Sequence, residues 1–154
     1  MTSNGQEAES ESRRRIAELR TLLDQGIREN IGVGSSLGIF MESLAEGRAV
    51  YALDPSPATI NALFTVHGGV LTTLMDTAMG SAVFTRLGDG AFYTTLELKA
   101  NFIRSVRADG NRLTCVGQTV HVGRRTATAE ARITDPNGRL IAHGSCTCMI
   151  FPPE

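Results

Sequence analysis

Residues 67–78, H-G-G-V-L-T-T-L-M-D-T-A, combine groups that could carry out acyl transfer. A carboxylate such as that of Asp76 can activate a water molecule or attack an electrophilic carbon itself. Backbone N–H groups at the start of a helix can hold a developing oxyanion, and Gly68 and Gly69 would let a substrate approach that backbone closely. This chemistry requires a helix that begins near Gly68 and carries Asp76 in its middle.

Residues 66–85 are predicted to form that helix, and its surface is unusual because Asp76 is its one formally charged residue. A helix that faces water normally carries a charged face. We therefore expect the sheet to bury one side of this helix and a second subunit to cover the other. A central acid, three glycines and several hydroxyls argue against a membrane span. The apolar side is predicted to comprise Val70, Leu71, Leu74, Met75, Ala78 and Ala82, and the opposite side Thr72, Thr73, Asp76 and Gly80.

The spacing between Gly68 and Asp76 has a consequence for assembly. Eight residues correspond to roughly 12 Å along a helix, which is too far for both to act on one carbonyl group. If both are functional, the acid must come from a neighbouring antiparallel helix, which predicts a two-fold dimer with composite sites. The alternative is structural: Asp76 as a buried acid bonded to Thr72 or Thr73, and His67 as a satisfied polar group.

The remaining chain supplies the elements that must position this helix. Residues 1–12 are expected to be a disordered polar tail, residues 13–34 an amphipathic helix and linker, and residues 35–154 one folded domain. In 92–103, alternation places Leu96, Leu98 and Ala100 on one face of a strand and Thr95 on the other. The overall prediction is an α+β fold, with an antiparallel sheet wrapped around one central helix. The expected strands are 37–44, 49–53, 92–103, 112–122, 124–134 and 139–151.

Composition excludes several classes of partner and site. The formal net charge of −1 gives no reason to expect nucleic acid or a membrane surface as partner. Residues 1–10 are polar and acidic, unlike a signal peptide, so a cytoplasmic protein is expected. No metal site is expected, because His143 would point away from Cys146 and Cys148 on a strand. The cysteines are interpreted as core thiols.

Several spaced motifs resemble the hotdog-fold acyl-CoA thioesterases of the phenylacetate-degradation (PaaI-like) and 4-hydroxybenzoyl-CoA thioesterase type. Asn61, the H-G-G of residues 67–69 and the D-T of residues 76–77 carry the first part of the resemblance. It continues through residues 93–105, 122–133 and 138–144, and covers roughly residues 35–151. The resemblance implies the hotdog fold, a long helix wrapped by a curved antiparallel sheet, in agreement with the predicted order of elements.

The resemblance also implies roles for individual residues. Asp76 would be the nucleophile or the general base, and the Gly68 amide would bind the thioester oxygen. Asn61 and His67 would lie near the thioester, and Thr95 would orient the attacking water. The chain departs from the family at Phe64, where relatives often have glycine, and at Glu97, where they have aspartate. The substrate-binding residues implied are Gly69, Thr77, Gly123, Arg124 and Arg125, with Gly123–Arg125 near the nucleotide and phosphates of coenzyme A.

The function predicted from the sequence is hydrolysis of a small aryl- or medium-chain acyl-CoA by a homodimer or a dimer of dimers. No metal or redox cofactor is expected, because the coenzyme A thiolate is already a good leaving group. One alternative is an acyl-CoA hydratase or dehydratase on the same fold, which the spacing from H-G-G to Asp76 disfavours. The other is a non-catalytic acyl-CoA-binding protein, which would have no reason to keep an acid in an otherwise uncharged helix.

Overall fold

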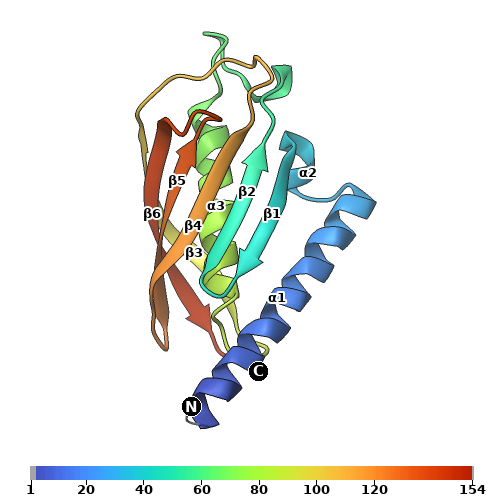
Figure 1. Ribbon diagram of the computed structural model, residues 1–154, viewed down its shortest axis with the longest axis vertical. Coiled ribbons are helices and arrows are strands. Elements are labelled where there is room, and N and C mark those ends of the chain that lie inside the picture. The colour runs from blue at the N-terminus through green and yellow to red at the C-terminus, as the bar shows by residue number, and fades with distance from the viewer. Residues whose placement is uncertain (1–2, 154) are drawn as a thin grey trace.

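The computed structural model describes residues 3–153 as a sheet wrapped around one central helix (Figure 1). Helix α3 is that central helix, and the longer helix α1 lies outside the sheet. The predicted α+β architecture is confirmed, and each strand begins and ends within two residues of its expected bounds. The elements in chain order are α1 (Ser3–Glu29), α2 (Val33–Leu37), β1 (Ile39–Ala45), β2 (Arg48–Leu53), the short 3₁₀ helix η1 (Pro57–Thr59), α3 (Gly68–Phe84), β3 (Phe92–Phe102), β4 (Leu113–Val122), β5 (Thr126–Thr134) and β6 (Leu140–Phe151).

The six strands form one antiparallel sheet in the order β1-β2-β4-β5-β6-β3. Strand β3, with 11 residues, therefore lies at an edge of the sheet. Its exposed side chains include Leu96 and Phe102. A long edge strand with exposed apolar side chains presents unpaired backbone groups that another strand can bind.

Small residues allow the sheet to approach α3 closely. Strand β5 turns Ala127, Ala129 and Ala131 toward the core, and all three are buried. On β4, a Cβ added to Gly117 would lie only 2.4 Å from the carbonyl group of Ala78 in α3, so a larger residue would push the helix away. The three cysteines are buried, as predicted. No helix in residues 3–153 has the length and apolar character needed to cross a membrane.

A bulge in β3 changes which of its residues face the helix. The pairing with β6 shifts register between Thr95 and Glu97. As a result Leu96 is 54% exposed, whereas Leu98 and Ala100 pack against the core. A bulge inserts one extra residue and so changes the alternation of side chains. The prediction that Leu96 shares a face with Leu98 is wrong, and Thr95 faces inward instead.

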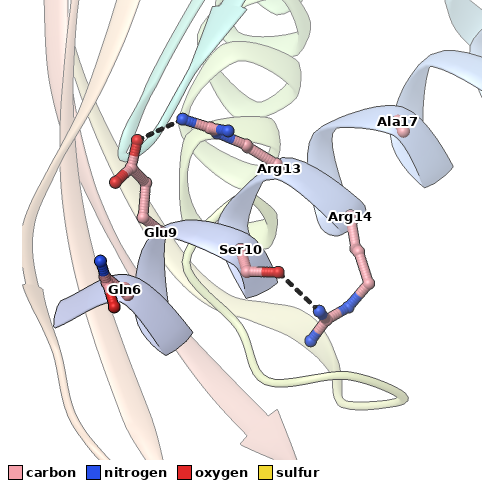
Figure 2. Close-up of a pocket in the computed structure, with 6 residues that line it drawn as sticks. All are labelled: Gln6, Glu9, Ser10, Arg13, Arg14 and Ala17. Atoms are coloured by element: carbon pink, nitrogen blue, oxygen red, sulfur yellow. Dashed lines mark hydrogen bonds and ion pairs between the residues drawn. The ribbon is translucent and has the colours of Figure 1, made fainter. Parts of the chain in front are cut away.

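Helix α1 is longer than the sequence predicts. Residues 3–12, expected to be part of a disordered tail, are helical, while residues 1–2 lie outside the described part of the chain. Pairs one turn apart support this first part of the helix: Arg13 with Glu9, and Arg14 with Ser10 (Figure 2). These side chains border a surface hollow of about 520 Å³ that is open to solvent and far from α3's first turn.

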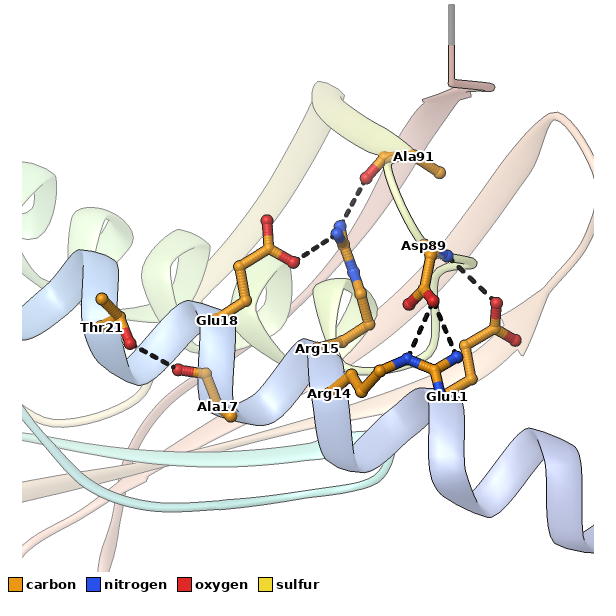
Figure 3. Close-up of polar contacts among 8 residues, drawn as sticks. All are labelled: Glu11, Arg14, Arg15, Ala17, Glu18, Thr21, Asp89 and Ala91. Atoms are coloured by element: carbon orange, nitrogen blue, oxygen red, sulfur yellow. Dashed lines mark hydrogen bonds and ion pairs between the residues drawn. The ribbon is translucent and has the colours of Figure 1, made fainter.

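Tertiary contacts hold the same part of α1 against the loop that follows α3 (Figure 3). The Ser12 hydroxyl donates to the Thr85 carbonyl over 2.9 Å, and the Arg14 guanidinium binds Asp89. Arg15 is buried, donates to the Ala91 carbonyl and lies 3.9 Å above the Phe84 ring. Of these residues, Ser12 belongs to the segment whose polar composition suggests a tail, and its hydroxyl supplies one of the contacts.

Candidate active site

The first two backbone N–H groups of helix α3, those of Gly68 and Gly69, differ in their hydrogen bonding. His67 is its N-cap, and the His67 Nδ1 atom accepts a hydrogen bond from the Gly69 N–H over 2.9 Å. A neutral imidazole with Nδ1 as acceptor carries its proton on Nε2. Within residues 3–153, no acceptor takes the Gly68 N–H. Gly68 therefore offers a donor at the positive end of the helix, and Gly69 does not.

Asn61 organises the loop that leads into α3. Its Oδ1 atom accepts hydrogen bonds from the Leu63 N–H over 2.9 Å and from the N–H and hydroxyl of Thr65, each over 3.3 Å. These contacts use the carbonyl side of the amide, so the NH₂ group is the part that could donate to a ligand. Asn61 thus lies at the same end of the molecule as His67 and Gly68.

Phe64 keeps a backbone conformation that normally favours glycine. Its φ is 59°, in the left-handed region, and its side chain is 74% exposed. Phe64 is one of the two positions, with Glu97, at which the sequence is expected to depart from the family pattern. A bulky residue in this region is strained by about 1–2 kcal/mol. Phe64 therefore places an exposed aromatic ring in the loop that leads into α3.

Asp76 lies in the middle of α3 and is oriented from β3. The Thr95 hydroxyl donates to Asp76 Oδ1 over 2.9 Å. Thr72 and Thr73 are not the partners of Asp76 that the structural alternative expects, because their hydroxyls donate to the carbonyls of Gly68 and Gly69. The bulge in β3 makes the Thr95 contact possible by turning that side chain toward the helix.

Tyr93, whose phenol is influenced by the charge of Asp76, is protonated and packed against α3. Burial, and then the charge of Asp76, raise the pKa of Tyr93, so its phenol stays neutral. The Tyr93 ring covers Gly80, where an added Cβ would lie 2.1 Å from the hydroxyl oxygen. Gly80 is buried, so its expected place on the open face of α3 is wrong. Elsewhere in the core, on β4, burial raises the pKa of Cys115 to about 12, which keeps this thiol in its neutral form.

The open face of α3 therefore carries Thr72, Thr73, Asp76 and Thr77, all half-buried. The Thr77 hydroxyl donates to the Thr73 carbonyl over 2.8 Å. This uses the hydroxyl proton, so the Thr77 side chain can offer a ligand its methyl group and an acceptor oxygen but no donor. The predicted apolar side of α3, from Val70 to Ala82, is buried throughout.

Gly123, Arg124 and Arg125 lie far from Gly68 within one chain. They form the turn between β4 and β5, which closes with a hydrogen bond from the Gly123 N–H to the Thr126 carbonyl. This turn lies near the end of α3, whereas Gly68 begins it (Figure 1). The 17 residues of α3 span about 25 Å at 1.5 Å each. One chain thus brings together Asp76 with Thr95, and separately Asn61, His67 and Gly68.

Sequence reasoning missed two neighbours of these residues. The Phe102 ring of β3 covers Gly68, and a Cβ added to Gly68 would lie 3.1 Å from it. Tyr93 fills the space beside Gly80. Both residues read as ordinary strand residues in the sequence, and only the register of β3 against α3 places them here.

Comparison with known proteins connects this geometry to a family. Residues 64–142, just over half of the chain, match the thioesterase superfamily. The 1,4-dihydroxy-2-naphthoyl-CoA hydrolase of Listeria monocytogenes is 26% identical over 120 residues, which cover 78% of this chain and 96% of that protein. The Escherichia coli acyl-coenzyme A thioesterase PaaI is 29% identical over 114 residues, covering 74% of this chain and 79% of its own length.

Solved structures of other proteins are also similar to this chain. A conserved protein of Pseudomonas aeruginosa, PA5202, is 34% identical with a TM-score of 0.74, over 80% of this chain and 98% of that chain. The structure of E. coli PaaI superposes with a TM-score of 0.77 over 95% of this chain and 97% of its own, at 23% identity, which supports the hotdog fold. The chain belongs to the thioesterase superfamily and is a thioester hydrolase.

Proposed function

We propose that this protein hydrolyses acyl-CoA thioesters to the free acid and coenzyme A. The single observation that carries the proposal is that α3 holds two groups suited to thioester hydrolysis. These are Asp76, oriented by the Thr95 hydroxyl, and the N–H of Gly68 at the helix start, which no described residue engages. The names of the Listeria and E. coli relatives, a naphthoyl-CoA hydrolase and an acyl-coenzyme A thioesterase, support coenzyme A as the carrier.

The proposed chemistry divides the work between these two groups. The Gly68 N–H donates to the thioester oxygen, whose negative charge grows as the carbonyl carbon becomes tetrahedral. Asp76 either takes a proton from a water molecule that attacks this carbon, or attacks the carbon itself to give an anhydride that water then hydrolyses. The C–S bond breaks, and the thiolate of coenzyme A leaves and takes up a proton. Asn61 and His67 Nε2 donate at the same end of α3, and Thr95 orients the carboxylate.

The two groups act on one thioester only if they come from different protomers. We propose a two-fold dimer in which the open faces of two antiparallel α3 helices meet, so that Asp76 of one faces Gly68 of the other. The exposed edge of β3 supports this assembly, because it can pair with a second copy of itself. The antiparallel arrangement also brings the partner's Arg124 and Arg125 toward the Gly68 end, where they would bind the phosphates of coenzyme A.

Replacement of Asp76 tests the proposal. Release of free thiol is measured with aryl- and fatty-acyl-CoA substrates for the wild type and for Asp76→Asn. We expect the variant to lose about 100-fold or more in kcat, because no other carboxylate lies on α3. Glu130→Gln, which neutralises an exposed acid on β5, is the matched control and should keep wild-type turnover. The proposal fails if the wild type cleaves no acyl-CoA, or if Asp76→Asn retains near-normal turnover.

A further inference from the structure

An apolar cavity of about 410 Å³ lies between α1, α2, β1 and α3. Its volume is within the range of small-molecule sites, roughly 300–1,000 Å³. Leu22 and Ile27 of α1 and Val33 of α2 border it, and each remains more than half exposed. A cluster of exposed apolar side chains around a cavity indicates a site that binds something apolar. Tyr51 and Met41 of the sheet also line it.

The cavity lies beside the proposed catalytic acid. Thr77, the residue that follows Asp76 on α3, is one of its lining residues. The Thr77 hydroxyl is held by the Thr73 carbonyl, so the side chain can offer its methyl group to the cavity. An acyl group whose thioester carbon lies at Asp76 can therefore extend past Thr77 into this space.

The chemistry of the lining selects one end of the substrate. Among the described residues that border the cavity, the one with a formal charge is the acid Asp24. An acidic side chain repels phosphates, and the described residues that line the cavity include no lysine, arginine or histidine to attract them. The cavity therefore suits the apolar acyl end of the substrate and not the nucleotide end.

We propose that this cavity is the acyl-binding pocket, and that the N-terminal α1–α2 segment determines which chain lengths are hydrolysed. The inference rests on the proposed acyl-CoA thioesterase function. In the dimer, each site would combine Gly68 of one protomer with Asp76 and the α1–α2 pocket of the other. The ligand class is an extended aliphatic acyl group, long enough to pass Thr77 and contact Val33.

Filling the pocket tests this assignment. Val33 is 55% exposed, so Val33→Trp adds volume to the wall without disturbing the buried core. Hydrolysis of acetyl-, hexanoyl- and decanoyl-CoA is compared in wild type and variant. We expect kcat/KM for decanoyl-CoA to fall by at least about tenfold, and that for acetyl-CoA to stay within about twofold. The matched control is Val120→Trp on β4, which is 63% exposed and lies outside the cavity, and it should change neither value.

Binding provides a second readout that does not need turnover. In the Asp76→Asn background, decanoyl-CoA should bind more tightly than free coenzyme A by calorimetry, and Val33→Trp should abolish the difference. Equal losses for all three substrates, no loss with decanoyl-CoA, or an unchanged binding difference would overturn the pocket assignment. A change in the sedimenting mass of Val33→Trp would also overturn the pocket assignment, because it would show that this face is a contact between copies of the chain. A wild type that cleaves none of the three substrates would instead contradict the proposed function, and calorimetry alone would then decide the pocket.

Discussion

Gly68 and Gly69 are neighbours with the same side chain, yet the structure gives their amides different roles. The imidazole of His67 takes the Gly69 N–H and so satisfies one of the free donors at the helix start. This contact also fixes the path of the chain into α3. The Gly68 N–H is left without an acceptor among residues 3–153 and so can donate to a ligand. At the scale of the residue, the proposed oxyanion donor is therefore one specific backbone group.

Replacing that group alone is possible because proline is well tolerated at the first position of a helix. His67, with φ −65° and ψ 135°, already has the conformation that a residue before proline prefers. Gly68→Pro removes the N–H, and we expect kcat for acyl-CoA hydrolysis to fall by about 100-fold or more. Gly68→Ala keeps the N–H and places a Cβ against the same Phe102 ring, so it controls for the contact. Equal losses in the two variants would show that crowding, and not the lost donor, is responsible.

The sequence predicted which residues could form the site. The alternating pattern of β3, however, did not predict the contact between Thr95 and Asp76. Strict alternation in β3 places Thr95 on the face opposite Leu98. The bulge at Leu96 places both on the same face, and nothing in the run T-T-L-E-L marks where the extra residue falls. The resemblance to a family assigned Thr95 to the site, as a residue that orients the attacking water, and the structure adds the 2.9 Å hydrogen bond from its hydroxyl to Asp76.

At the scale of the element, α1 shows why polar composition is a poor guide to disorder. The segment before Arg13 has few apolar residues, so it predicts a solvated tail. Its stability in the structure comes from two sources that composition does not reveal: pairs one turn apart along the helix, and contacts with the loop after α3. The second source depends on residues more than 70 positions away in the sequence. The apolar pattern of α3, in contrast, predicts its buried side directly.

Arg15 is the main anchor in this contact, and its loss should destabilise the protein. The guanidinium is almost fully buried, stacks on Phe84 and donates to the Ala91 carbonyl. We expect Arg15→Ala to lower the free energy of unfolding by about 2 kcal/mol, because a stacked cation and a charged hydrogen bond are removed. Arg13→Ala removes a paired arginine two positions earlier that is exposed, and it should leave the urea midpoint close to wild type. Similar midpoints for both variants would contradict an anchoring role for Arg15.

At the scale of the whole molecule, the proposed site is incomplete in one chain. The Gly68 end of α3 and the Gly123–Arg125 turn lie at opposite ends of the fold, and Asp76 lies between them. Two antiparallel copies of α3 would bring each of these groups next to the one it lacks. The spacing within the sequence predicts this arrangement, but the sequence of one chain does not specify the surface that brings the copies together. The exposed β3 edge is the feature of the structure that offers such a surface.

Mixing two inactive variants tests the composite site. In a dimer of one Asp76→Asn chain and one Gly68→Pro chain, one site combines the intact Gly68 with the intact Asp76, while the other site carries both changes. Equal amounts co-refolded at random give mixed dimers as half of the population, so we expect about a quarter of wild-type activity. Co-refolding Asp76→Asn with the Asp76→Asn, Gly68→Pro double variant should restore nothing, because no intact Asp76 is present. If the first mixture stays inactive while sedimentation shows dimers, Gly68 and Asp76 do not act together across two protomers.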